Sequence, residues 1–96
     1  MNMIEIDYCG NRLKVTFDAS PSARLFINGI QRAEEFCHET TCVIQLTSTL
    51  QTDYEWHEFV EATFRFSAEA VLVEVTANRA ILLTETHSLS RSEGAI

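Results

Sequence analysis

The side chains best suited to metal binding or redox chemistry lie together near the middle of the chain. Cys37, His38 and Cys42 fall within the six residues CHETTC. Two thiolates and an imidazole could supply three of the four ligands of a tetrahedral zinc site. Cys9 could be the fourth ligand if the first hairpin folded over this segment. Alternatively, Cys42 begins a strand as a small buried hydrophobic residue, while Cys37 and His38 lie on a loop.

A second group of ionisable side chains surrounds His57. Glu55, Glu58 and Glu61 are close to it in the sequence, and on a β-strand Glu55, His57 and Glu61 would share one face. Neighbouring carboxylates raise the pKa of a histidine, which suits the imidazole to general acid–base catalysis near neutral pH. His57 and Glu55 are therefore a candidate acid–base pair. The alternative is an exposed polar face, which is common in an acidic chain.

Two aromatic residues beside His57 are candidates for ligand binding. Tyr54 and Trp56 could form a stacking platform for a sugar or a base. On a strand, however, the same face would also carry Phe64 and Phe66. Packing in the hydrophobic core is therefore the alternative interpretation of Tyr54 and Trp56.

Most motifs that signal an enzyme or a bound cofactor are missing from the sequence. Glycine, which phosphate-binding loops and nucleophile elbows require, occurs only three times. GxGxxG, P-loop, GxSxG, CxxC and calcium-loop patterns are all absent from the sequence. We therefore expect no cofactor, and the sequence favours a protein that is not an enzyme.

The charge of the chain disfavours several classes of partner. Fourteen Asp and Glu residues oppose seven Lys and Arg residues, which gives a formal charge of −7. Such a surface repels nucleic acid and anionic membranes. The segment MNMIEIDYCGNRLK does not resemble a signal peptide, and no apolar run approaches the roughly 18 residues of a membrane helix. An odd number of cysteines favours reduced thiols, so we expect a cytoplasmic protein.

The elements that must position these residues show the two-residue alternation of β-strands. Strands are predicted at 3–8, 12–18, 23–28, 30–33, 42–50, 71–76 and 80–86. Turn residues at Cys9-Gly10-Asn11, Asn28-Gly29 and 77–79 predict three β-hairpins. The polar segment EEFCHETT (34–41) is predicted to be a connecting loop.

The longest alternating stretch, residues 54–66, is expected to form the centre of the fold. Its even-numbered residues are mostly apolar, but the alternation slips at Glu58 and Phe59, where we expect a β-bulge. A helix from 53 to 62 is the alternative, because TDYE fits a capping box and several apolar residues have helical spacing. The β-branched and aromatic residues of the later half favour the strand.

The whole pattern predicts a single all-β domain. Seven to eight short strands joined by frequent turns are typical of an antiparallel β-sandwich, and an α+β fold with one helix near 53–62 is the alternative. Residues 1–88 are expected to form the domain, and residues 89–96 a flexible C-terminal tail. No internal repeat is visible in the sequence.

Three segments, MIEIDYCGNRLKV, LFINGIQRA and LQTDYEWHEFVEA, resemble parts of small bacterial proteins of unknown function. The resemblance covers most of the chain and implies a compact β-rich fold. It implies no activity, ligand or site residue.

These observations favour a non-enzymatic binding or self-assembly module with a protein or small-molecule ligand. The segments 71–75 and 80–86 carry little protective charge, so one of them is expected to pair as an edge strand in a homodimer. A metal-binding or redox module that uses Cys37, His38 and Cys42 is the first alternative. An acid–base site at His57 and Glu55 is the second.

Overall fold

Eight antiparallel strands account for most of the described chain. The computed structural model describes residues 2–53 and 56–89, and the side chains in these ranges except those at positions 52, 53 and 56. The strands are β1 (Asn2–Tyr8), β2 (Asn11–Asp18), β3 (Ser22–Ile27), β4 (Ile30–Phe36), β5 (Cys42–Asp53), β6 (Trp56–Phe66), β7 (Ala70–Ala77) and β8 (Ala80–Ser88). The predicted all-β fold is confirmed. The alternative helix over 53–62 is wrong, because β6 is a strand from its first residue.

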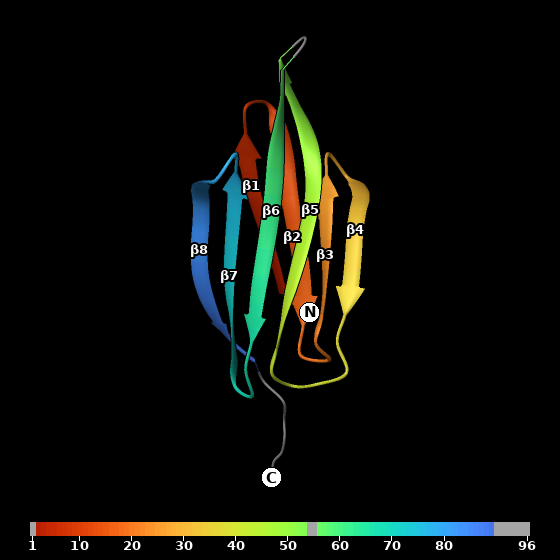
Figure 1. Cartoon of the computed structure of the whole chain (residues 1–96), viewed down its shortest axis with the longest axis vertical. Coiled ribbons are helices and arrows are strands. Elements are labelled where there is room, and N and C mark those ends of the chain that lie inside the picture. Colours follow the sequence, from red (N-terminus) through yellow and green to blue (C-terminus); the bar gives the residue numbers. More distant parts are fainter. Residues whose placement is uncertain (1, 54–55, 90–96) are drawn as a thin grey trace.

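The strands form two four-stranded sheets, each in chain order: β1-β2-β3-β4 and β5-β6-β7-β8. The sheets lie face to face, as in a β-sandwich, but they are offset sideways. β4 therefore projects beyond β5 on one side, and β8 projects beyond β1 on the other (Figure 1). No helix able to cross a membrane occurs in the parts of the chain that the structure describes.

The hydrophobic core lies between the sheets and follows the predicted alternation. Phe17 of β2 and Phe64 of β6 meet across it, with ring centroids 5.7 Å apart, and each is at most 1% exposed. Burial of one such side chain contributes about 1.5–3 kcal/mol. The even-numbered residues of β6 from position 60 are buried, as expected, and they are Val60, Ala62, Phe64 and Phe66.

The expected bulge at Glu58 and Phe59 is wrong. The pairing of β5 with β6 continues without a shift to Gln51 and His57, and the irregularity lies beyond it, between Gln51 and Asp53. Phe59 is 46% exposed on the outer face. Glu58 faces inward, where its Oε1 accepts a hydrogen bond of 2.5 Å from the Tyr8 hydroxyl. The apolar–polar pattern is interrupted here, but the backbone register is not. The inward position is polar because Glu58 pairs with Tyr8 at this end of the core.

Two predicted boundaries also change. β4 continues to Phe36, so the connection between the sheets is shorter than the expected loop over 34–41. Leu89, which we placed in the C-terminal tail, is 8% exposed, and its N–H donates to the carbonyl of Glu69 at 2.8 Å. The remainder of the predicted tail, residues 90–96, lies outside the described residues.

Of the two segments from which an edge strand was expected, 71–75 belongs to β7 and pairs with β6 on one side and β8 on the other. It is therefore not an edge strand, because the backbone of an inner strand has no free side. The segment 80–86 lies in β8, which is an edge strand. Hydrophobic alternation alone does not distinguish a strand in the middle of a sheet from one at its edge.

The two sheets repeat the same hairpin, although the sequence shows no repeat. The register shifts between Leu25 and Phe26 in β3–β4, and between Val75 and Thr76 in β7–β8. Both bulges stand at the same distance from the turn. In each case the extra residue belongs to the outermost strand, as Arg32 in β4 and Leu82 in β8.

The turns of these hairpins carry equivalent asparagines. Asn28 and Asn78 have positive φ angles of 52° and 49°, which asparagine tolerates better than most residues. The N–H of each donates to a carbonyl of the neighbouring inner strand, at Arg12 and Phe59 respectively, over 2.8 Å. The Oδ1 of each accepts from the N–H of that same residue, also over 2.8 Å. The asparagine thus adds one more bonded pair to the sheet.

Candidate functional site

A polar cleft of about 550 Å³ lies at the end of the sandwich that holds the β1–β2 and β3–β4 turns. Its size falls within the usual range for small-ligand sites. Both sheets contribute to its lining, which consists of Asn11, Ile27, Asn28, Arg32, Thr49, Leu50, Gln51 and His57.

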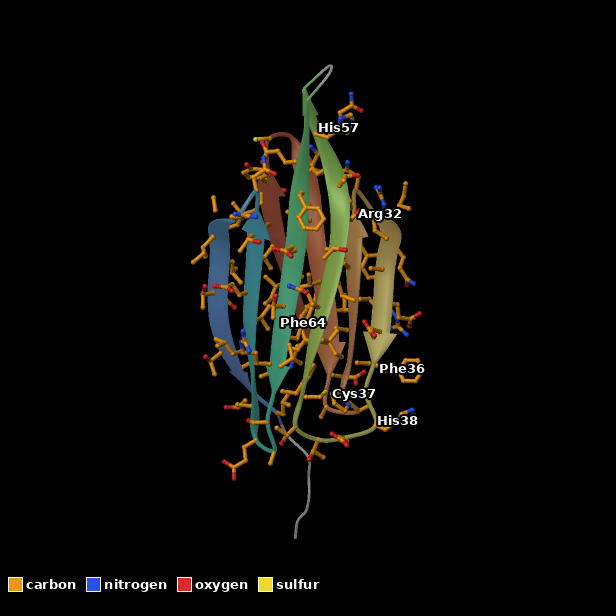
Figure 2. All side chains as sticks on the ribbon, in the orientation of Figure 1. Arg32, Phe36, Cys37, His38, His57 and Phe64 are labelled. Atoms are coloured by element: carbon orange, nitrogen blue, oxygen red, sulfur yellow. The ribbon has the colours of Figure 1, made fainter. Side chains whose placement is uncertain are left out.

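The two basic side chains of the cleft come from different sheets. Arg32 is the extra residue of the β4 bulge, and bulges commonly redirect a side chain at the edge of a sheet. His57 is near the start of β6, where it pairs with Gln51 of β5. Figure 2 shows both residues on the same side of the molecule. A guanidinium and an imidazole therefore share one cleft.

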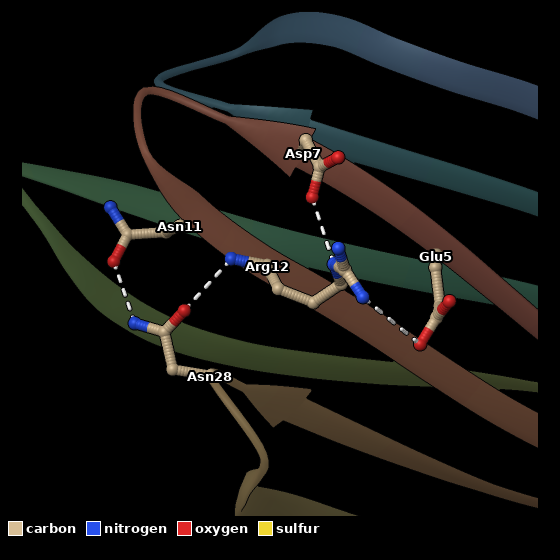
Figure 3. A network of polar contacts seen from close by, with 5 residues as sticks. All are labelled: Glu5, Asp7, Asn11, Arg12 and Asn28. Carbon is tan, nitrogen blue, oxygen red and sulfur yellow. Dashed lines mark hydrogen bonds and ion pairs between the residues drawn. The ribbon is translucent and has the colours of Figure 1, made fainter.

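Two asparagines support the cleft (Figure 3). Asn28 Nδ2 donates to Asn11 Oδ1 at 2.8 Å, while Asn28 Oδ1 accepts from the Arg12 N–H. Asn11 Nδ2 in turn donates to the carbonyl of Gln51 in the other sheet, at 3.1 Å. These amides hold the two sheets together at this end. Their polar atoms are therefore already engaged in structural hydrogen bonds.

The arginines near this end differ in their partners. Arg12 lies on the outer face, with Nε 2.8 Å from Asp7 Oδ1 and one terminal nitrogen 3.9 Å from Glu5 Oε2 (Figure 3). The hydrogen bond to Asp7 and the charges of both carboxylates raise the pKa of Arg12. Arg32, in contrast, forms no ion pair or hydrogen bond with any residue that the structure describes. It brings to the cleft a positive charge that no described residue pairs with.

Of the residues predicted around His57, only part can be placed. Tyr54, Glu55 and the side chain of Trp56 lie outside the described residues, so the acid–base pair and the stacking platform stay predictions. Glu58 faces the core side, towards Tyr8. Glu61 accepts a hydrogen bond of 3.3 Å from Gln45 Nε2 on the outer face.

The cysteine cluster lies at the opposite end of the sandwich (Figure 2). Cys37 and Cys42 are half-buried, and burial, followed by the neighbouring Cys37 thiol, raises the pKa of Cys42 to about 11. The His38 ring packs edge-on against Phe36, with centroids 6.0 Å apart. Cys9 lies in the β1–β2 turn at the far end, so it cannot be their fourth ligand. Within the ranges 2–53 and 56–89, no three His, Cys, Asp or Glu residues are grouped to hold a metal ion.

The sequence analysis identified His57 but missed Arg32 as a cleft residue. The available signal was the Asn28-Gly29 turn, which fixes the hairpin but not the bulge that follows it. Comparisons with protein-family models, with curated proteins and with solved structures found no match.

Proposed function

We propose that the protein is a non-enzymatic binding module whose polar cleft takes a ligand bearing a carboxylate. The observation that carries the proposal is the guanidinium of Arg32, which pairs with none of the described residues, in a cleft that also contains His57. A guanidinium presents parallel N–H donors that match the two oxygens of a carboxylate. The imidazole of His57 offers a further donor in the same cleft.

The charge of the protein favours a singly charged group over a polyanion. The chain carries a formal charge of −7, which repels multiply charged ligands at long range. A short-range pair between Arg32 and one carboxylate is less affected, because salt screens exposed charges beyond about 10 Å at 0.1 M ionic strength. The ligand is therefore expected to be a small or locally acidic molecule.

The test is a titration of the ¹⁵N-labelled protein with acetate, followed by NMR. Saturable shifts are expected at Arg32, His57 and Gln51, with a dissociation constant on the order of 1 mM or weaker, as befits a single exposed ion pair. Arg32→Ala should remove the saturable shifts. Arg65→Ala is the matched control, since Arg65 is an exposed arginine of β6 outside the cleft. Equal loss in both variants, or shifts spread over the surface, would contradict the proposal.

A further inference from the structure

We infer that the ligand of the cleft is an extended peptide segment that adds as a strand to the free edge of β5. This inference rests on the proposed function, because the added strand would deliver its carboxylate to the same cleft. β5 is an edge strand, paired with β6 on one side only. Addition of a strand to an exposed sheet edge is a recurrent mode of peptide recognition.

The hydrogen-bonding direction of each β5 residue follows from the neighbouring strand. Phe59 of β6 bonds towards β7, through Asn78. Successive residues of a strand bond to opposite sides, so Glu58 bonds to β5, where it pairs with Leu50. Even-numbered residues of β5 therefore bond to β6. The N–H and C=O groups of the odd-numbered residues point to the free edge, and these include Val43, Gln45, Thr47 and Thr49. The carbonyl of Gln51, at the cleft end of β5, already accepts a hydrogen bond from Asn11 Nδ2 at 3.1 Å.

This edge lacks the usual protection against pairing. β5 has twelve residues, and no charged side chain occurs from Cys42 to Thr52. Natural edge strands commonly carry charges, prolines or bulges that prevent pairing with another chain. β1 carries Glu5 and Asp7, whereas β4 and β8 each contain a bulge. A long and uncharged edge is suited to receive a strand.

Beside this edge, β4 presents a surface that the facing sheet does not cover. Ile30, Ala33 and Glu35 pair with residues of β3 that face the core, and Arg32 lines the cleft. We call these four residues the β4 shelf. Ile30 is 64% exposed, Arg32 and Glu35 are exposed, and Ala33 is half-buried. Ile30, Arg32 and Glu35 are exposed because β4 projects beyond β5 (Figure 1), whereas Ala33 packs against the edge of the core. A strand added to β5 would lie over this surface.

In the second sheet, the positions of β8 that correspond to the β4 shelf carry larger apolar side chains. By the register of the two hairpins, Leu82 and Leu83 of β8 correspond to Arg32 and Ala33 of β4. Both leucines pack against the core. The ring of His87, further along β8, lies 5.2 Å from that of Phe17. In β4 the smaller Ala33 also packs against the core, but Arg32 is exposed, so less of the β4 shelf is covered.

The projection of β4 beyond β5 favours a single added strand over a second copy of the protein. A partner paired through its own β5 would project its β4 towards the first copy by the same distance. Because β4 projects beyond β5 in both copies and in the same layer, the β4 strands of the two copies would overlap. One extended segment without a second layer behind it avoids this clash.

The charged residues of the shelf and the cleft predict where the peptide carries charged residues. Arg32 and His57 lie at the cleft end of β5, and Glu35 lies further towards its start. An antiparallel strand, the commoner arrangement, would begin at the cleft. Its inward side chains occur at every second residue. We therefore expect an acidic residue near its amino end and a basic residue near its carboxyl end, both facing the shelf.

The probe is the peptide acetyl-Thr-Asp-Thr-Val-Thr-Lys-Thr-amide, titrated into the ¹⁵N-labelled full chain. Shifts are expected along β5 and the β4 shelf. A peptide with Asp and Lys exchanged has the same composition and should bind about tenfold more weakly, since two exposed ion pairs are reversed. Equal affinity of the two peptides would contradict the charge assignment. Shifts confined to other strands would overturn the inference.

Two further variants test the backbone pairing itself. Thr47→Pro removes only an N–H that faces the free edge, so β5 should fold and peptide binding should be lost. Thr84→Pro makes the same change on the free edge of β8, by the same alternation, and should bind normally. If Thr47→Pro does not fold, N-methylation of the peptide backbone tests the same pairing with β5. A methyl on a central threonine nitrogen should abolish binding, and one on the valine nitrogen should not.

The acetate titration separates the two proposals. Acetate binding in the cleft without binding of either peptide would refute strand addition and leave the proposed function standing. If neither acetate nor either peptide binds, the proposed function is refuted as well. If the Arg32→Ala variant bound the peptide with unchanged affinity, the peptide would add to β5 without using the cleft. That result would refute the proposed connection between strand addition and carboxylate binding.

Discussion

Two substitutions in β6 test whether its backbone alternates without a break. Phe64 is fully buried, and its ring lies 5.7 Å from that of Phe17 and 6.4 Å from that of Phe66. Truncation of such a phenylalanine to alanine costs about 3–5 kcal/mol, as transfer free energy is lost and a cavity remains. Phe59 lies in the same strand but is 46% exposed. Phe59→Ala should cost less than about 1 kcal/mol, as for other surface sites.

The free energy of unfolding of both variants is measured by urea denaturation, followed by far-UV circular dichroism and extrapolated linearly to zero urea. A domain of this length has a total stability of about 5–14 kcal/mol, so Phe64→Ala removes a large share of it. If that variant is too unstable to measure, Phe64→Leu provides the smaller perturbation. A cost for Phe59→Ala equal to that for Phe64→Ala would refute the reasoning, because it would place both side chains in the core.

Three further predictions follow from the contacts of single residues. With its pKa raised to about 11, mainly by burial, the half-buried Cys42 thiol stays protonated at pH 8, so a thiol reagent should label exposed Cys9 far faster; equal rates by mass spectrometry would contradict this. The hydrogen bond to Glu58 raises the pKa of Tyr8 from 10.0 to about 12. Its contribution to stability is therefore present below pH 10 and is lost as the pH rises through 12; absorbance titration of a variant without the other tyrosine should show the raised value, and Glu58→Gln should lower it. The edge of β8 stays a candidate for homodimer formation, in which case sedimentation equilibrium should show a dimer that Thr86→Pro, on the same free edge, converts to monomer; a monomer at every concentration would exclude it.

Much of the fold could be predicted because its signals are local. The turns at Gly10 and Asn28-Gly29 need residues that accept positive φ angles, and the sequence provides them at these places. The inward residues of β2 and β6 alternate with polar ones, which indicates both the strand and its buried face. The slip at Glu58 misled the prediction, because a polar side chain on an inward position looks like a break in register. Its partner, Tyr8, is 50 residues away in the chain.

The candidate site was less predictable than the fold. His57 was identified from its acidic neighbours, yet the charged residue that lines the described cleft with it is Arg32, on the other sheet. Nothing near Arg32 in the sequence distinguishes it from the other arginines. Its place depends on a bulge, and the bulge depends on the pairing of β4 with β3. Likewise, Cys37 and Cys42 are neighbours both in sequence and in space, whereas His38 turns to Phe36.

Local sequence patterns were sufficient to predict the strands, most of their turns and the side of each strand that faces the core, because these depend on residues a few positions apart. The acidic surface and the uncharged stretch from 42 to 52 can also be read directly from the sequence. Which strands are edges, how far the sheets are offset and which side chains meet in the cleft could not be predicted in this way. These features depend on the packing of one sheet on the other. Packing places Arg32 and His57 in the same cleft, although nothing in their spacing along the chain predicts that they line a common site.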